Sequence, residues 1–368
     1  MSVAETQYFA LLRSALWNTP LIIEGDVEWD AVLHLAKHHA TNVLLSGVAS
    51  QMTGDNRPPD SMIDEMQSAM RINFINHLQL QRILASAVKL LQDHHIQPVL
   101  LKGFGLAMLY PNPNLRQFGD IDLYVGIGDF HEACKLLRTL PGSYNWREEV
   151  DLGRHYNIEF GQYPMEVHRV SADLSGRKAL AVYETIEHEG LCEKAQRVNY
   201  DGLELMIPSK EFMVFFTFFH AWHHFLTSGV GWRQISDVAV TLHAYHGQLD
   251  SDKLYQWITS MHLLKPWQTF GYLMVDRLGL PVDEMPFYNV SCQRRANRLF
   301  SRIMSEGNFR RPNRFKRKRP KVESLKKLHT FISIFVSFFQ LATLFPSQAF
   351  QGMSTALKRG IQKKFQKK

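Results

Sequence analysis

The chain has 368 residues, of which 45% are hydrophobic and 21% are charged, as is ordinary for globular proteins. This length favours two or three modules over a single core. Three cysteines without CxxC spacing exclude a disulfide scaffold and a zinc knuckle, and they indicate a reducing compartment. Much of the net charge of +7 falls after Arg294. Because residues 1–17 lack a basic start followed by an apolar run, we expect a cytoplasmic protein.

Residues 1–95 are predicted to form an N-terminal helical region. Apolar residues recur at helical spacing in the stretches 8–17, 29–45 and 75–95. Pro58 and Pro59 indicate a loop between two of these helices.

At residue 96 the pattern changes, and we predict a second region over 96–208. Its short apolar runs favour strands, and its proline and glycine clusters favour turns. The predicted elements are a buried strand at 98–101 ending at Lys102-Gly103, a short helix at 104–110, a strand at 120–125, a helix at 129–140, a hairpin of strands 155–160 and 165–170 joined through 161–164, and a strand at 203–207.

A helical domain is predicted over 209–305, with Ser209 as the N-cap of its first helix. Residues 306–368 are predicted to be a basic tail with an apolar helix. Its basic run 310–321 is followed by residues 328–345, which include no Asp, Glu, Lys or Arg.

Three interpretations of this apolar helix stay open: it packs against the protein or a partner, lies at a membrane interface, or spans the membrane. Residues 310–345 are therefore candidates for contact with RNA or with an anionic membrane surface. In the latter case the cytoplasmic protein would be peripheral at the membrane.

Two aspartates flank one isoleucine in Asp120-Ile121-Asp122. Alternate side chains of a strand share a face, so the two carboxylates point the same way. Like charges this close are unfavourable unless a cation lies between them. Two other acidic pairs, at residues 26–28 and 250–252, do not follow a strand that ends in glycine, and they are interpreted as solvated or capping residues.

Such a pair can hold two divalent cations when a neighbouring strand adds a third carboxylate, for which Glu166 and Glu159 are the candidates. Bound cations lower the pKa of an attacking hydroxyl and neutralise a leaving pyrophosphate. A glycine at a strand end, such as Gly103, lets phosphates approach the backbone closely.

The pattern resembles a known family at four places in the chain. These are Lys102-Gly103, Tyr110-Pro111 with Arg116, Asp120-Ile121-Asp122-Leu123, and Glu166-Val167-His168. It resembles the uncharacterised nucleotidyltransferase family of the DNA polymerase beta-like superfamily, well over residues 96–170 and more loosely beyond. The resemblance implies an α/β (α+β) fold. In this fold a polymerase-beta-like nucleotidyltransferase core with a small mixed sheet is flanked by N-terminal and C-terminal helical regions.

The resemblance also implies residue roles. Asp120, Asp122 and Glu166 would be catalytic and would bind Mg2+ or Mn2+. The nucleotide would contact Lys102, Gly103, Gly105 and Arg116.

Alternatives remain for several of these residues. Lys102 could be a solvated strand cap, and Arg116 could hold the aspartate loop through a salt bridge. His168 could be a structural hydrogen-bond donor.

Further candidates for a substrate cleft are His168, His220, Arg233 and Asp237. Arg233 and Asp237 lie four residues apart on a predicted helix, which also favours an ion pair between them.

Two functions follow. The first is metal-dependent transfer of a nucleoside monophosphate from an NTP, ATP among them, to a hydroxyl acceptor (protein, RNA or small molecule) with release of pyrophosphate. The alternative is an inactive nucleotidyltransferase-fold protein that binds RNA or a membrane surface through its basic apolar tail. Gly103-Phe104-Gly105 allows this alternative, because it lacks the serine that the superfamily usually places after the first glycine.

Overall fold

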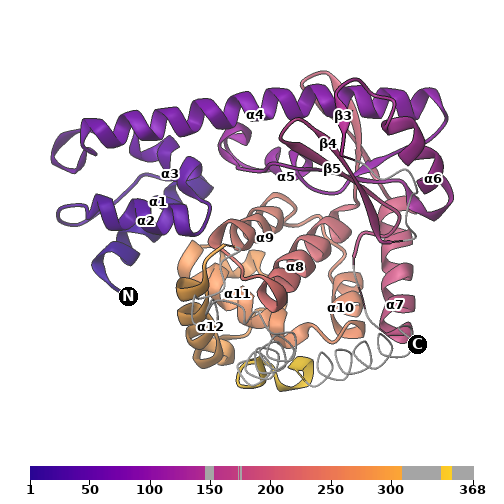
Figure 1. The fold of residues 1–368 in the computed structure, drawn as a ribbon. Helices are drawn as coiled ribbons and strands as arrows, with labels where there is room; N and C mark the ends of the chain where they lie inside the picture. The colour runs from indigo at the N-terminus through magenta and orange to yellow at the C-terminus, as the bar shows by residue number, and fades with distance from the viewer. Residues whose placement is uncertain (146–152, 173, 175, 309–340, 350–368) are drawn as a thin grey trace, which may run out of the picture.

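The computed structural model describes residues 1–145, 153–172, 174, 176–308 and 341–349 (Figure 1). Its N-terminal part is helical, as predicted, with the long helix α4 running along one side of the molecule (Figure 1). The helices are α1 (Val3–Trp17), α2 (Trp29–His38), α3 (Asn42–Ala49) and α4 (Asp60–Asp93). α4 begins directly after the predicted proline loop, with Pro59 at its N-cap.

A mixed sheet forms the centre of the next region. Its seven strands have the order β3-β4-β5-β2-β1-β7-β6 in the part of the chain that the structure describes. They are β1 (Val99–Leu100), β2 (Ile121–Tyr124), β3 (Ser143–Tyr144), β4 (His155–Phe160), β5 (Tyr163–His168), β6 (Gln196–Tyr200) and β7 (Leu203–Ile207). β2 runs parallel to β5 and antiparallel to β1, and all four residues of β2 are buried.

Three helices accompany the strands, and they are α5 (Phe104–Ala107), α6 (Gly126–Leu137) and α7 (Arg177–His188). The strands β3 and β6 and the helix α7 were not predicted. The predicted hairpin exists, but its connection is shorter than the predicted four-residue loop. Phe160 pairs with Tyr163, so only Gly161 and Gln162 form the turn. Gly161 has a φ of 65°, which a glycine adopts without strain and which makes the tight reversal possible.

The C-terminal region is again helical, with Ser209 capping its first helix by accepting a hydrogen bond from the Phe212 N–H. The helices are α8 (Lys210–Thr227), α9 (Trp232–Ala244), α10 (Ser251–Ser260), α11 (Leu264–Leu278) and α12 (Gln293–Glu306). Short 3-10 segments lie at Gly54–Asn56, Pro113–Leu115, Val282–Glu284 and Val290–Cys292, and a π turn lies at Glu189–Glu193.

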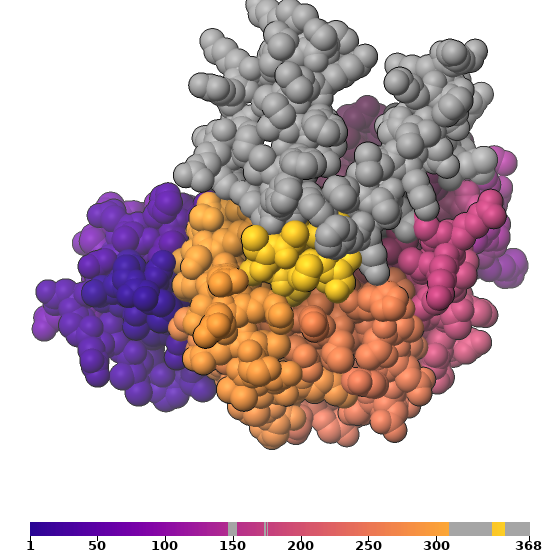
Figure 2. All heavy atoms as spheres, turned by 90° about the horizontal axis from the view of Figure 1, so that it is seen from below, coloured from indigo at the N-terminus to yellow at the C-terminus, as the bar shows by residue number. Residues whose placement is uncertain are grey.

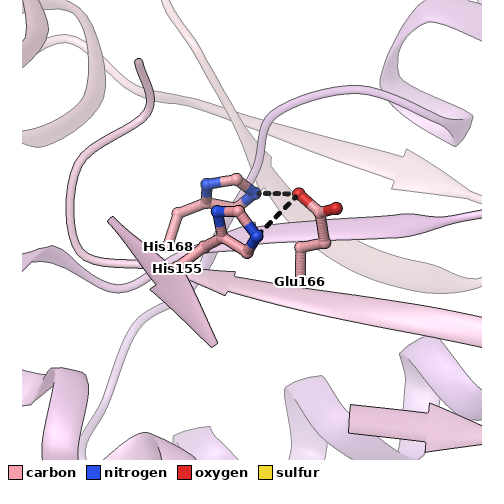
Figure 3. A group of neighbouring side chains, drawn as sticks. All are labelled: His155, Glu166 and His168. Atoms are coloured by element: carbon pink, nitrogen blue, oxygen red, sulfur yellow. Dashed lines mark ion pairs between the residues drawn. The ribbon is translucent and has the colours of Figure 1, made fainter. Parts of the chain in front are cut away.

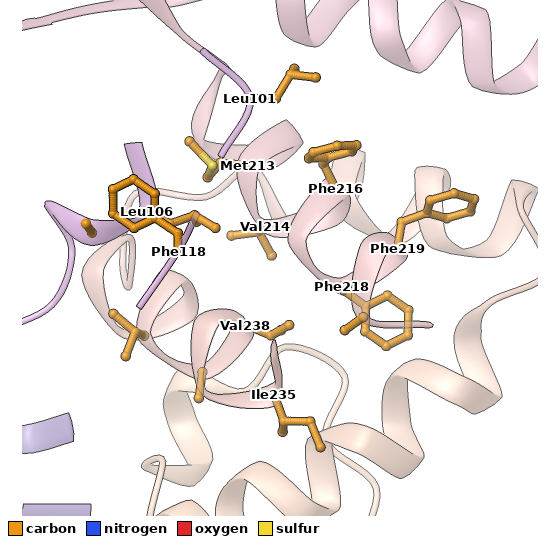
Figure 4. Close-up of a cluster of buried hydrophobic side chains, with 14 of the residues drawn as sticks. Leu101, Leu106, Phe118, Met213, Val214, Phe216, Phe218, Phe219, Ile235 and Val238 are labelled. Atoms are coloured by element: carbon orange, nitrogen blue, oxygen red, sulfur yellow. The ribbon is translucent and has the colours of Figure 1, made fainter. Parts of the chain in front are cut away.

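Helix α8 is apolar almost all round, because it is buried between the sheet region and the other C-terminal helices. Figure 4 shows Leu106 and Phe118 from the sheet region, Phe216 and Phe218 from α8, and Val238 from α9 within one hydrophobic cluster. Burial of each phenylalanine side chain contributes about 1.5–3 kcal/mol. The two regions therefore share a core, and the position of α8 relative to the sheet is determined by packing.

Residues 341–349 are the described part of the tail, and they lie against the C-terminal helices (Figure 2). The Phe345 ring is buried and meets Trp222 edge-on with a centroid distance of 5.0 Å. This part of the predicted apolar helix packs against the protein. The basic run and the rest of the apolar segment, residues 310–340, lie outside the described residues. Among the helices that the structure describes, none is both long enough and apolar enough to cross a bilayer.

Acid should destabilise the fold through His39, which is fully buried between the rings of Tyr8 and Trp232. Burial lowers the pKa of His39 to about 3, whereas the unfolded chain keeps the ordinary value near 6.5. The folded state therefore binds fewer protons, so stability falls as the pH falls below 6.5. Between pH 7.5 and 5.5, His39 alone should cost about 1.4 kcal/mol.

Urea unfolding at both pH values tests this. The pH-dependent loss should be smaller by about this amount in His39→Leu. It should be unchanged in the control His131→Leu, whose side chain is exposed. Equal losses in the wild type and in His39→Leu would contradict the assignment.

Candidate active site

A polar cavity of about 330 Å3 lies between the sheet and helices α8 and α9. Of the eleven residues predicted for the site, ten line it, and Gly105 does not. Those ten are Lys102, Gly103, Arg116, Asp120, Asp122, Glu166, His168, His220, Arg233 and Asp237. Residues from five separate stretches of sequence thus converge on one space.

The parallel pairing of β2 with β5 brings two of the carboxylates together. Asp122 and Glu166 are register partners across these strands, so their side chains share one face of the sheet. The alternative carboxylate, Glu159, lies farther along β4, where its Oε1 accepts a hydrogen bond from Asn145 at 2.7 Å. It does not line the cavity, so the geometry favours Glu166 as the third carboxylate.

Asp122 is fully buried and charged, and two cationic groups of the protein face it. Its Oδ1 lies 3.0 Å from Lys102 Nζ and 3.1 Å from His168 Nε2. Burial by itself would raise the pKa of Asp122, but Lys102 and His168 outweigh burial and hold this pKa below its ordinary value. In the same way, burial would lower the pKa of His168, but Asp122 and Glu166 raise it.

Asp120 lies just before β2, and its pKa is raised, first by the charge of Asp122 and then by burial. The repulsion expected from the sequence is therefore real. Lys102 compensates only part of it.

The second oxygen of Asp122 decides how well these carboxylates suit a cation. Oδ2 is buried and has no hydrogen-bond partner among the described residues. A buried carboxylate oxygen without a partner is costly, and it is the kind of oxygen that Mg2+ and Mn2+ coordinate. Together with Asp120 and Glu166, Asp122 thus forms a donor set that fits a divalent ion.

Gly103 ends the strand beside the aspartates. The Leu101 N–H donates to the Asp122 carbonyl at 3.0 Å, so Lys102 and Gly103 continue alongside the carboxylate pair. Gly103 has a φ of 65°, and a Cβ there would lie 3.4 Å from the Phe118 ring. Glycine is required by the backbone conformation, and its small size keeps this wall of the cavity open.

Arg116 is fully occupied by the protein. Its Nε and Nη2 donate to the two carboxylate oxygens of Asp237 at 2.7 and 3.0 Å, and Nη1 donates to the Gly103 carbonyl at 3.1 Å. Tyr110 donates to the same carboxylate at 2.7 Å. Tyr110, Arg116, Asp237 and the Gly103 carbonyl form a buried network, which we call the Arg116–Asp237 lock.

The lock corrects the predicted ion pair between Arg233 and Asp237. Asp237 pairs with Arg116 from the sheet region, because both of its carboxylate oxygens accept hydrogen bonds from that guanidinium. Arg233 instead donates to the Gln117 carbonyl at 2.9 Å. Gly105, predicted as a nucleotide contact, lies beside Ile207 and Met213 instead, because α5 turns it toward β7 and α8.

Helix α8 contributes histidines to the opposite wall. His220 Nε2 and His224 Nε2 lie 2.9 Å apart, one helical turn from each other. Burial lowers the pKa of His220 well below its ordinary value and that of His224 to about 3. Both rings are therefore neutral, and both ring nitrogens of His224 have partners, since its Nδ1 lies 2.9 Å from Ser228 Oγ.

Several residues at the site were missed from sequence, and Arg154 and His155 are two of them. Arg154 lines the cavity, and His155 pairs in register with His168 across the hairpin. A four-residue loop would have set His155 opposite Val170, which hid the pairing. The Gly161-Gln162 turn was the signal that could have revealed it.

The chain is similar to a known protein family. Residues 25–279 match the family described as "Uncharacterised nucleotidyltransferase". No curated protein matches the chain significantly.

Two solved structures are similar. One is the antibiotic-resistance factor ANT(2'')-Ia, with 14% identity over 50% of this chain and 92% of that chain, at a TM-score of 0.36. The other is an antigenic nucleotidyltransferase-like protein from Paracoccidioides brasiliensis, with 12% identity over 55% of this chain and 93% of that chain, at a TM-score of 0.33.

The described residues form a mixed α/β fold built around a seven-stranded sheet. Because the match spans more than half of the 368 residues, the chain belongs to the uncharacterised nucleotidyltransferase family.

The Arg116–Asp237 lock should be important for stability. Asp237→Asn leaves a buried guanidinium without its counter-charge, which should cost about 3–5 kcal/mol in the free energy of unfolding. As a matched control, Asp60→Asn breaks the exposed Arg57–Asp60 pair, which has a similar distance of 2.6 Å, and it should cost less than about 1 kcal/mol. Similar costs for the two variants in guanidinium unfolding would contradict this role.

Proposed function

We propose that this protein transfers a nucleoside monophosphate from an NTP to a hydroxyl acceptor and releases pyrophosphate. Asp120, Asp122 and Glu166 would hold the divalent ion, Mg2+ or Mn2+. The observation that supports this best is the buried carboxylate of Asp122, which has a free oxygen and faces a polar cavity beside the glycine turn at Gly103. When bound, the ion would neutralise charge on the triphosphate and lower the pKa of the attacking hydroxyl.

The residues around the aspartates have distinct tasks in this proposal. Lys102 keeps Asp122 ionised, and its side chain, 17% exposed, lies at the cavity surface, within reach of a phosphate. Gly103 lets the phosphates approach the backbone. Arg233 adds a positive charge near Asp120. Arg116 contributes indirectly. It holds the Gly103 carbonyl in place and would not bind the ligand by itself.

The acceptor would lie between Glu166 on the sheet and the histidines of α8 on the opposite wall. Glu166 is partly exposed. Burial by itself would raise the pKa of Glu166, but the interactions with its histidine neighbours, first the hydrogen bond from His168, outweigh burial and lower this pKa, so the carboxylate is ionised. It is therefore available to accept the proton of the acceptor hydroxyl. The neutral His220 places a polar ring on this wall without repelling a cationic or an anionic acceptor, and His224 holds that ring in place.

Nucleotide binding tests the first step. Calorimetry with ATP, GTP, CTP or UTP should show binding of at least one NTP in the presence of Mg2+ or Mn2+, and Asp122→Asn should weaken it at least tenfold. Asp252→Asn is a matched control, because Asp252 ends the other Asp-x-Asp sequence and lies exposed on α10. It should bind as the wild type does.

Label transfer tests the reaction. Each α-labelled NTP is incubated with the protein, Mg2+ or Mn2+ and a cell extract, and the label should appear in an acceptor with the wild type and with Asp252→Asn but not with Asp122→Asn. If no NTP gives transfer and the protein instead binds RNA or anionic vesicles tightly, the inactive-fold alternative holds.

A further inference from the structure

We propose that His155, Glu166 and His168 form a binding site for a first-row transition-metal ion of the Zn2+ type, next to the aspartate pair. This site goes beyond the proposed function, because it selects an ion that the aspartates alone would not favour. It shares Glu166, and Asp122 at its fourth position, with the proposed magnesium site but does not depend on nucleotidyl transfer.

The three side chains already point toward one another (Figure 3). In the described part of the chain, one ligand atom from each lies within 4.8 Å of the other two. His168 Nε2 is 3.3 Å from Glu166 Oε2, and His155 Nε2 is 4.0 Å from the same oxygen. Both imidazole rings therefore face one carboxylate oxygen.

These distances suit a metal. With bond lengths of about 2.0–2.2 Å, the ligands of a tetrahedral zinc ion lie roughly 3.3 Å apart. The pair of His168 and Glu166 already has this separation. His155 must move by less than about 1 Å, and its half-exposed side chain leaves room for that shift.

The donor atoms decide which ion binds. Two imidazole nitrogens and one carboxylate oxygen favour Zn2+, Co2+ or Ni2+, whereas Mg2+ prefers an all-oxygen set and keeps much of its water. A site built only from Asp120, Asp122 and Glu166 would have the opposite preference. The two histidines therefore make the donor set selective.

Asp122 provides an independent observation. Its Oδ1 lies 3.1 Å from His168 Nε2, so it borders the same space. Its Oδ2 is buried and without a partner among the described residues. Asp122 can therefore complete a fourth position beside the three ligands.

The backbone holds these donors in place. His155 is on β4, Glu166 and His168 are on β5, and Asp122 is on β2, and these three strands are adjacent in the sheet. His155 pairs in register with His168, and Asp122 pairs with Glu166. Since the donors sit on paired strands and not on loops, the site is preorganised.

The test measures metal binding directly, without nucleotide. The full-length protein is stripped with a chelator and titrated with Co2+, which reports nitrogen ligands and tetrahedral geometry through its visible absorption. We expect binding of one Co2+, displacement by Zn2+ and resistance to a thousandfold excess of Mg2+. Elemental analysis of the Zn2+-loaded protein gives the stoichiometry.

His155→Ala removes one ligand from a half-exposed position, so the fold should be retained. This variant should weaken Co2+ binding by about 100-fold or more. Loss of an outer-shell partner already costs about 10–100-fold, and loss of a direct ligand should cost at least as much. His188→Ala is the matched control, since His188 also lies beside a carboxylate, Glu193, at 3.8 Å, but outside the site. It should bind Co2+ as the wild type does.

Asp120→Asn separates the two metal sites. It should leave Co2+ affinity unchanged while weakening Mg2+-dependent nucleotide binding. Displacement of Co2+ by Mg2+, or equal Co2+ affinity of His155→Ala and the wild type, would overturn the proposal. Failure of nucleotide binding alone would refute the proposed function and leave the transition-metal site standing.

Discussion

The buried charge of Asp122 is the constraint on which the site depends. A carboxylate removed from water is unfavourable unless charged or hydrogen-bonding partners surround it. Lys102 and His168 provide them, and they come from the strand ends on either side of β2. The order of strands around β2 is thus what makes this charge tolerable. One oxygen of Asp122 has no hydrogen-bond partner among the described residues, and a divalent ion at this oxygen would satisfy it.

The cavity beside Asp122 exists because two regions distant in sequence are joined. The Arg116–Asp237 lock ties the turn at Gly103 to helix α9, and the hydrophobic cluster around α8 closes the rest of the interface. Arg116 thus does more for the shape of the cavity than for its charge. A guanidinium saturated by a carboxylate and a carbonyl has little capacity left for a phosphate.

Local patterns predicted much of the site. Apolar residues around Asp120-Ile121-Asp122 indicated a buried strand, and the strand is there. The pair Lys102-Gly103 indicated the end of a strand, and β1 ends just before this pair, at Leu100. Side-chain partners were harder to predict. Asp237 was expected to pair along its helix with Arg233, but Arg116 approaches from the sheet with two parallel hydrogen bonds, which a single i,i+4 contact on a helix does not match.

The sequence by itself determined which residues carry chemistry and which short segments form strands, because side-chain periodicity and glycine are local properties. Only the tertiary structure decided which of these residues meet. A hairpin turn shorter by two residues brought His155 opposite His168, and the parallel pairing of β2 with β5 set Glu166, and not Glu159, beside Asp122. Strand register and helix docking depend on contacts between distant segments, and a linear pattern does not encode these distances.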